Sequence, residues 1–246
     1  MNHAVNVSLH YGYRLFDTAL IYQNEKELGT ALKNLLPVHG LKREDIFVTS
    51  KLFPQQGNNT EIIPHLFEGI LERLQMDYVD LLLIHAPAVT PGVRKDVWLA
   101  FEAIKASGRA RSIGVSNYEI EHLEEMRAYA IHWPPVANQV EFHPWLPRRA
   151  LREYCQREGI FFQAWSSVAP DIHYGGPKLT AEPMVKAVAE KYGTKTATVL
   201  LSYALSQGAG VIPKSTSEEH IRENYQCVFK LSREDIAQLD KLAKIQ

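Results

Sequence analysis

Apolar runs of strand length alternate with stretches of helical apolar spacing along almost the whole chain, and this alternation limits the folds open to it. Strand and helix follow each other at intervals of roughly 25–35 residues, which is typical of βα units and a parallel sheet. Strands are predicted at 13–16, 45–51, 78–85, 111–117, 135–143, 160–167 and 210–215. Helices are predicted at 24–36, 61–74, 97–105, 122–129, 149–158, 183–193, 197–207, 221–229 and 232–245. The sequence therefore predicts an α/β fold.

Polar residues at the strand ends favour a (β/α)8 TIM barrel over an open, doubly wound sheet. A closed barrel brings the carboxyl ends of all its strands to one mouth, where barrel enzymes build their sites. A doubly wound sheet binds its ligand at one switch point, usually with GxGxxG after the first strand, and that motif is absent. The polar or aromatic residues at the ends of the predicted strands are Asp17, Lys51, His85, Asn117, Gln139, Trp165 or Ser166, and Lys214.

Seven strands are predicted, one fewer than this barrel requires. Residues 1–12 resemble the end of a helix that leads into the strand at 13–16. We therefore expect strand 1 to be the missing element, so that seven βα units remain. An incomplete barrel exposes two sheet edges and part of an apolar interior, which is unfavourable.

Composition sets broad limits on the class of protein. The 246 residues, 46% of them hydrophobic, suffice for one large core, and no Gly/Ser-rich linker divides them, so we predict a single domain over 1–246. A net charge of −1 gives no preference for nucleic acid or membrane. The two cysteines form no disulfide framework or CxxC metal motif. With no signal peptide and no apolar run of bilayer length, we expect a cytoplasmic protein and a monomer.

Four of the residues near the predicted mouth have the chemistry of carbonyl reduction. The hydroxyl of Tyr22 is a proton donor, and an ammonium group beside it, from Lys51, would stabilise the phenolate. Asp17 could pair with Lys51 and keep it charged, and neutral His85 could orient a substrate oxygen. Since no side chain delivers hydride, a nicotinamide cofactor is implied.

The motifs that contain these residues resemble the aldo-keto reductases over essentially the whole chain. GYRLFDTALIYQNEKELG at 12–29 is similar to the first signature of that family, and IPKSTSEEHIRENYQ at 212–226 to its last. VTSKL, IHAP, GVSN and NQVEFHP follow between them in the order of the family. The resemblance implies a (β/α)8 barrel that reduces aldehydes and ketones with NADPH. It assigns the general acid to Tyr22, its tuning to Lys51 and Asp17, and carbonyl positioning to His85.

The resemblance also implies the contacts of the nicotinamide end of the cofactor. Ser116, Asn117 and Gln139 match the residues that hydrogen-bond the carboxamide. Trp165 takes the place of the aromatic residue, usually tyrosine, that stacks on the ring. The resemblance also implies that Asp17 lies beside the same ring.

Further contacts implied by the resemblance concern the rest of the dinucleotide. They fall on Ser166 and Val168 for the pyrophosphate, on Lys214, Ser215 and Thr216 for the 2′-phosphate, and on Glu223 and Asn224 for the adenine. His220 replaces the arginine that usually clamps the 2′-phosphate. Because histidine lacks a planar charged fork, we expect a weaker preference for NADPH and some use of NADH.

Three departures from the family pattern concern the substrate side. Ala86 follows His85 where a tryptophan is common, so Phe53 is expected to be the main flat wall of a wide pocket. The Gly-Thr end of strand 1 and a long C-terminal loop are expected to be missing. Small or varied carbonyl substrates fit such a pocket.

Each assignment has a simpler alternative. Asp17 and Lys51 could be a structural ion pair, His85 a core histidine, and Trp165 barrel filling. Ser116-Asn117 could be a turn and Lys214-Ser215 a helix N-cap. For the whole chain, the alternatives are a regulatory barrel that binds cofactor without turnover, a Schiff-base aldolase using Lys51, and a metal-dependent hydrolase, although no cluster of His and Asp ligands supports the last.

Overall fold

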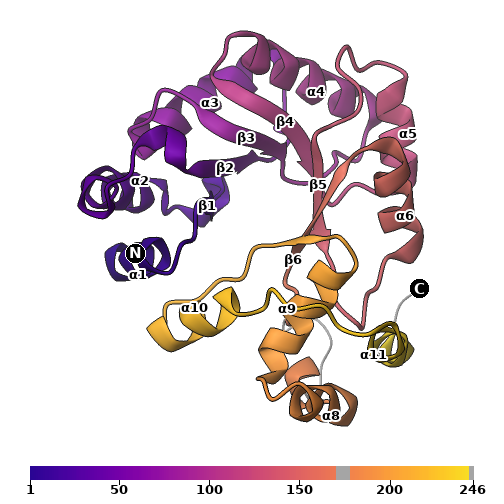
Figure 1. The fold of residues 1–246 in the computed structure, drawn as a ribbon. Helices are drawn as coiled ribbons and strands as arrows, with labels where there is room; N and C mark the ends of the chain where they lie inside the picture. The colour runs from indigo at the N-terminus through magenta and orange to yellow at the C-terminus, as the bar shows by residue number, and fades with distance from the viewer. Residues whose placement is uncertain (170–177, 244–246) are drawn as a thin grey trace. The chain divides into compact units, whose positions relative to one another are not determined.

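The computed structural model describes residues 1–169 and 178–243, which belong to two compact units. Unit 1 comprises Met1–Asn138 and Glu158–Ile160, and unit 2 comprises Gln139–Arg157 and Phe161–Gln246 (Figure 1). In sequence order, the hydrogen-bonded strands run from β1 to β7. The predicted α/β fold with its seven strands is therefore confirmed in the described part of the chain.

Unit 1 holds the first four βα repeats (Figure 1). Its strands are β1 (Leu15–Asp17), β2 (Phe47–Leu52), β3 (Val79–Ile84) and β4 (Ala110–Ser116), and β5 (Ala137–Glu141) begins in it. Its helices are α1 (Asn2–His10), α2 (Glu25–Leu35), α3 (Asn59–Leu74), α4 (Pro91–Ala106) and α5 (Ile120–Arg127), with short 3-10 turns η1 (Leu20–Tyr22), η2 (Pro37–His39) and η3 (Arg43–Asp45). The pairs β1–β2, β2–β3 and β3–β4 are parallel, as predicted.

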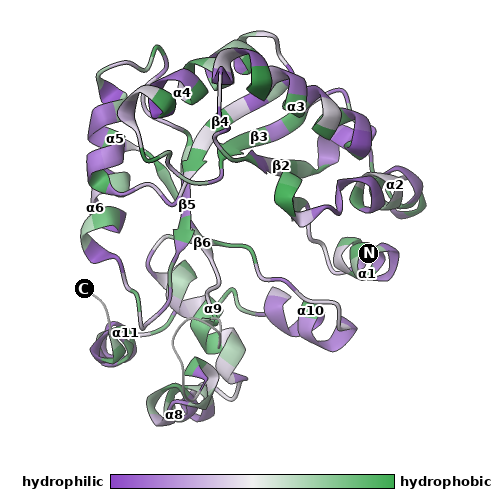
Figure 2. Ribbon diagram, turned by 180° about the vertical axis from the view of Figure 1, so that it is seen from behind, coloured by the Kyte–Doolittle hydropathy of each residue, from purple (hydrophilic) through white to green (hydrophobic). Residues whose placement is uncertain are grey.

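Apolar burial explains why these elements form. Every residue of β3 is buried, so its run of apolar residues reads as a central strand. α3 packs on β2, and α4 packs on β3 and β4. Figure 2 shows hydrophobic residues along β3 and a mixture of hydrophobic and hydrophilic residues along α4, as expected for a helix with one buried face.

A glycine is required where α2 meets α3. A Cβ atom added to Gly29 would lie 2.2 Å from the carbonyl oxygen of Leu74, which is backbone and has little room to shift. The last residue of the first signature motif is therefore a packing requirement between two helices.

Unit 2 contains the later repeats (Figure 1). In it, β6 (Phe161–Trp165) pairs in parallel with β7 (Gly210–Val211). The helices are α6 (Arg149–Glu158), whose last residue belongs to unit 1, α8 (Pro183–Lys191), α9 (Thr196–Ser206), α10 (Glu218–Tyr225) and α11 (Arg233–Leu239), with 3-10 turns η4 (Leu179–Ala181) and η5 (Asp240–Leu242). Within residues 1–169 and 178–243, no helix is long and apolar enough to cross a lipid bilayer.

Several boundaries differ from the predicted ones. α4 begins at Pro91, six residues earlier than predicted, because proline suits the first position of a helix. α10 covers 218–225 where 221–229 was predicted, because the Ser217 side chain accepts from the N–H of His220 and starts the helix there. α11 ends at Leu239, and the end of the predicted helix at 232–245 reaches beyond the described residues.

Candidate active site

The ends of β1 and β2 bring Asp17 and Lys51 together. Asp17 is opposite Thr49 in the parallel register, and Lys51 lies two residues further along β2, on the same face. The ammonium group of Lys51 donates to a carboxylate oxygen of Asp17 and to the backbone oxygen of Thr18, at 3.0 Å. Since Lys51 is 1% exposed, these acceptors compensate a charge that water does not reach.

Tyr22 lies at the end of η1, next to this ion pair. Its hydroxyl oxygen is 3.4 Å from the nitrogen of Lys51, which also lies 4.9 Å from the centre of the ring. The Thr18 hydroxyl donates to the side chain of Asn24 at 2.6 Å and so braces the turn that carries Tyr22. The tyrosine is 47% exposed, so its hydroxyl can meet a ligand from solvent.

His85 follows β3 and faces both Tyr22 and Phe53. The rings of Tyr22 and His85 meet edge to face with centroids 5.7 Å apart, and Phe53 stacks on His85 at 4.2 Å. Burial, and to a smaller extent the charge of Lys51, lower the pKa of the imidazole to about 4. His85 is therefore neutral near pH 7.

The end of β4 adds Ser116 and Asn117. The side-chain amide of Asn117 donates to the backbone oxygen of His85 at 2.9 Å and to the hydroxyl of Ser116 at 3.2 Å. Asn117 has a φ of 61°, a left-handed conformation that asparagine tolerates better than most residues. Ser116 and Asn117 thus fix the backbone segment that carries His85. Unit 1 brings together all six of its predicted site residues, Asp17, Tyr22, Lys51, His85, Ser116 and Asn117.

Unit 2 places the predicted nicotinamide and pyrophosphate residues on β5, on β6 and after it. Gln139 is buried and donates to the side chain of Gln163 at 2.8 Å. Trp165 ends β6 and is partly buried, and Ser166 follows it with a φ of 53°. The N–H of Ala169 donates to the oxygen of Ser166 at 2.8 Å, which closes a turn around the half-exposed Val168.

The predicted phosphate residues precede α10. Lys214 and Thr216 are exposed, and the hydroxyl of Ser215 accepts from the N–H of Ser217 at 3.0 Å. Ser217 caps α10, so the alternative reading of Lys214-Ser215 as the N-cap is wrong. An exposed ammonium group and two hydroxyls before a helix N-terminus form a donor set suited to a phosphate.

The other predicted residues of this segment lie on α10 itself. His220 is exposed in the first turn of the helix. Glu223 and Asn224 are partly buried one turn further, and Glu223 lies 3.9 Å from the Lys195 ammonium group.

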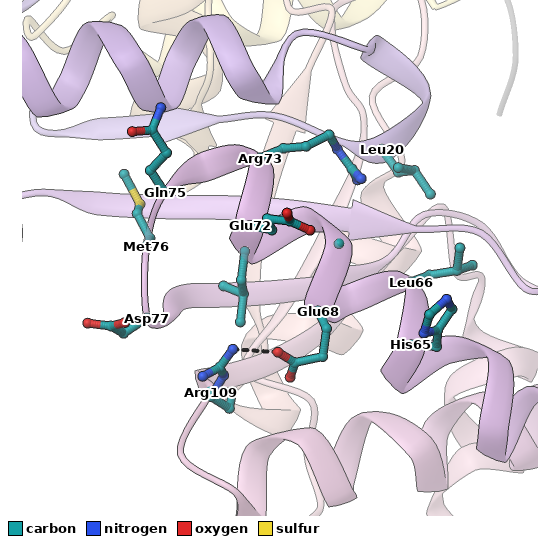
Figure 3. A pocket seen from close by; sticks show the side chains of 12 residues that line it. Leu20, His65, Leu66, Glu68, Glu72, Arg73, Gln75, Met76, Asp77 and Arg109 are labelled. Carbon is teal, nitrogen blue, oxygen red and sulfur yellow. Dashed lines mark hydrogen bonds and ion pairs between the residues drawn. The ribbon is translucent and has the colours of Figure 1, made fainter.

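Two cavities in unit 1 differ in their relation to these residues. One, of about 650 Å³, lies along α3 and contains the ion pair of Glu68 and Arg109, but none of the predicted site residues line it (Figure 3). The other has a volume of about 520 Å³. It is lined by Phe53 and by the two chain neighbours of Tyr22, which are Ile21 and Gln23. Volume alone therefore does not locate the site, because the smaller of these two cavities is the one that reaches the ring of Phe53.

Some contributors were not singled out in the sequence. Thr18 supplies an oxygen to Lys51 and a hydroxyl to the turn of Tyr22, and its position directly after Asp17 was the available signal. Gln55 and Asn59 organise the loop after Phe53 through backbone contacts, for which no motif gives a signal.

A family model, "Aldo/keto reductase family", matches residues 1–244. The chain is 40% identical over 243 residues to a glyoxal reductase of Bacillus subtilis, with 98% of this chain and 83% of the relative covered. It is 38% identical over 258 residues to a D-galacturonate reductase of Hypocrea jecorina, with 96% and 80% covered. Over 266 residues it is 36% identical to an estradiol 17 beta-dehydrogenase 5 of Mus musculus, with 98% and 82% covered.

Solved structures agree with these similarities. The aldose reductase of Schistosoma japonicum superposes with a TM-score of 0.90 at 32% identity, covering 100% of this chain and 85% of that one. An aldo/keto reductase from Brucella melitensis gives a TM-score of 0.87 at 36% identity, covering 98% and 89%.

Proposed function

This chain belongs to the aldo/keto reductase family, an assignment that makes it an oxidoreductase acting on small carbonyl compounds, and on that premise we propose that Tyr22 donates the proton in reduction of an aldehyde or ketone. The observation that supports this most is the position of Lys51, which touches both Asp17 and the hydroxyl of Tyr22. A structural ion pair would not require a half-exposed phenol at its end.

The proton step follows from the charges around the phenol. When a carbonyl oxygen gains negative charge, it takes the hydroxyl proton of Tyr22, and the phenol oxygen becomes negative. The ammonium group of Lys51, 3.4 Å away, stabilises that charge at once, without reorganisation of water. Asp17 and the oxygen of Thr18 hold Lys51 in place, so its charge is already positioned next to the Tyr22 hydroxyl before the reaction begins.

His85 is proposed to position the carbonyl. Its Nδ1 is enclosed and has no hydrogen-bond partner among the described residues, so Nε2 is the nitrogen left to donate to a substrate oxygen. Because the low pKa keeps the ring neutral, it directs the oxygen towards Tyr22 without competing as an acid. Phe53, stacked on the opposite ring face, is proposed as an aromatic wall of the substrate pocket.

The residues fit a nicotinamide dinucleotide as cofactor. The bound cofactor supplies the hydride that reaches the carbonyl carbon. Ser116, Asn117 and Gln139 offer hydroxyl and amide groups for its carboxamide, and Trp165 offers an aromatic face. Asp17 is proposed to lie beside the same ring.

For the rest of the dinucleotide, the proposed contacts are Ser166 and Val168 to the pyrophosphate, Lys214, Ser215 and Thr216 to the 2′-phosphate, and Glu223 and Asn224 to the adenine. Members of this family generally use NADP(H), and we propose NADPH as the main cofactor here. The exposed ammonium group of Lys214 supports this choice. His220 provides no permanent charge there, so NADH is proposed as a usable second cofactor.

We also propose that both units belong to one aldo-keto reductase domain of the (β/α)8 type. The family model matches residues 1–244, and the strand order follows the chain, as in a barrel.

A binding and turnover experiment tests the proposal. The full chain is titrated with NADPH by fluorescence, and the saturated protein is then assayed with glyoxal, D-galacturonate and an aromatic aldehyde. Binding together with oxidation of NADPH by at least one aldehyde supports the proposal. Binding without turnover would favour the regulatory alternative, and absence of binding would overturn the cofactor assignment. Incorporation of a carbonyl compound at Lys51 after borohydride treatment would point to a Schiff-base aldolase instead.

A further inference from the structure

The loop between β2 and α3 closes on one buried asparagine. The side-chain oxygen of Asn59 accepts from the N–H of Gln55 at 2.8 Å, and its amide donates to the oxygens of Gln55 and Gly57 at 2.9 and 3.2 Å. Asn59 is 1% exposed. A single side chain thus satisfies three backbone groups and fixes the course of the loop.

Capping of α3 does not explain this arrangement. The N-cap is Asn58, whose side-chain oxygen accepts from the N–H of Thr60 at 3.2 Å. Asn59 is the next residue, and its side chain turns back to the preceding loop instead of the helix. Its role is therefore to shape the loop.

The shaped loop holds Phe53 over the imidazole. The side-chain amide of Gln55 donates to the backbone oxygen of Phe53 at 2.7 Å. Leu52 and Ile84 are register partners in β2 and β3, so the next residues, Phe53 and His85, emerge side by side. Their rings lie 4.2 Å apart with 11° between the planes.

The ring of Phe53 has open space on one side. Phe53 and Gln55 also line the cavity of about 520 Å³, which Leu20 and Ile21 border from η1. A phenyl ring released from its hydrogen-bonded loop therefore has space to leave the imidazole. The hydrogen bond from Gln55 to the Phe53 oxygen restrains the backbone that carries the ring.

We propose that Asn59 and Gln55 are positioning residues that keep Phe53 stacked on His85 and so fix the aromatic wall of the substrate pocket. This proposal rests on the proposed function for its effect on substrates. Its effect on the imidazole does not depend on turnover. Loss of either side chain lets Phe53 move, exposes His85 to water and removes the flat surface that favours aromatic aldehydes over small ones.

The imidazole reports on the position of Phe53. The aromatic and charged groups next to His85 are Phe53 from the β2–α3 loop, Tyr22 from η1, and Lys51 from β2, which is paired with Asp17 from β1. Burial is the main cause of the low pKa of His85, and the ring of Phe53 provides part of that burial. Removing the ring should raise the pKa from about 4 towards its ordinary value of 6.5, while the charge of Lys51 stays.

NMR titration of the histidine rings in the full chain tests this. The variants are Asn59→Ala, Gln55→Met and Phe53→Ala, with Gln56→Met at an exposed neighbouring position as the matched control. His85→Gln identifies the His85 signal by its loss. We expect the pKa of His85 to rise in all three variants, most in Phe53→Ala, and to stay near 4 in the control.

A kinetic comparison completes the test. In Asn59→Ala and Gln55→Met, we expect KM for an aromatic aldehyde to rise roughly tenfold, the size of effect that one lost aromatic contact produces, with little change for glyoxal. If Phe53→Ala raises the pKa of His85 but Asn59→Ala and Gln55→Met do not, the two residues do not position the ring and the proposal fails. Gln55→Met removes one partly buried amide and is expected to fold, which keeps the test decisive if Asn59→Ala does not. A chain without reductase activity still gives the NMR result, so failure of the proposed function is distinguishable.

Discussion

The ammonium nitrogen of Lys51 lies 3.4 Å from the hydroxyl oxygen of Tyr22 and is bonded at the same time to the carboxylate of Asp17. One buried cation thus serves a structural partner and a solvent-accessible phenol. We therefore expect a substitution of Tyr22 and a substitution within the pair of Lys51 and Asp17 to have different consequences.

Tyr22→Phe removes only the solvent-accessible hydroxyl group. We expect kcat to fall by about 10²–10⁴, the usual contribution of a positioned acid, while the Kd for NADPH changes less than about twofold. Steady-state kinetics and fluorescence titration measure the two quantities. Tyr11→Phe, at the C-cap of α1, is the matched control. A Tyr22→Phe protein with normal turnover would contradict the proton-donor role.

Lys51→Met also removes the ion pair with Asp17. It leaves the carboxylate of Asp17, whose side chain is 12% exposed, without its cation, and such loss costs about 3–5 kcal/mol in free energy of unfolding. Urea unfolding measures this value. The double variant Asp17→Asn/Lys51→Met should lose less than the sum of the single variants, because it leaves no unpaired charge. Additive losses would show that the two side chains do not depend on each other.

The pKa of His85 predicts a stability change on the acid side of neutrality. The folded state holds the pKa near 4, whereas the unfolded chain has its ordinary value of 6.5. Between these values the unfolded state binds the additional proton, so the contribution of His85 to the free energy of unfolding is complete above pH 6.5 and falls as the pH drops towards 4. His85→Gln lacks this contribution.

Urea unfolding of the wild type and His85→Gln from pH 7.5 to 4.5 separates the contribution of His85 to stability from that of the other histidines. The wild type should lose more stability than the variant over this interval. Parallel curves would mean that His85 binds its proton equally well in both states.

Gly29 and Gly69 provide a pair of helix glycines with opposite expectations. Gly29→Ala would place a methyl group 2.2 Å from the backbone oxygen of Leu74, so we expect a loss of about 1–3 kcal/mol in free energy of unfolding. Gly69→Ala meets only the end of the flexible Arg73 side chain, at 3.1 Å, and should be neutral or gain up to about 1 kcal/mol from helix propensity. Thermal and urea unfolding check both, and equal effects would contradict the close approach of α2 and α3.

His220→Arg tests the cofactor assignment. A permanent guanidinium charge at this exposed position should increase the preference for NADPH over NADH by about tenfold, since a charge-assisted hydrogen bond contributes about 1.5–3 kcal/mol. The ratio of kcat/KM for the two cofactors measures it. His3→Arg, at an exposed position of α1, is the control. An unchanged ratio would place the 2′-phosphate elsewhere.

The sequence predicted the strands because each is a short apolar run that ends at a polar residue. Asp17, Lys51 and His85 lie at such ends, and parallel pairing then requires them to be neighbours, which the structure confirms. Tyr22 was a candidate because it follows Asp17 by five residues in the turn between strand and helix, and the motif resemblance then implied its role as general acid. The structure gives that turn as a 3-10 helix, which no periodicity reveals.

Other features depend on contacts that sequence patterns do not encode. Asn59 reads as an ordinary helix-start residue, and only the folded loop shows that its side chain serves the backbone of Gln55 and Gly57. The start of α10 was placed late because its first turn, Glu218 to His220, is polar, whereas the cap at Ser217 decides where the helix begins.

The ion pair between Asp17 and Lys51 also ties the short β1 to its neighbour β2. Natural selection for folding alone would preserve these two residues in a descendant that had abandoned catalysis. Tyr22 is half exposed and contacts that pair through its hydroxyl and its ring, neither of which the ion pair needs, so it would be free to change. Among related chains, the presence of Tyr22 is therefore a better indicator of an active enzyme than the presence of Lys51.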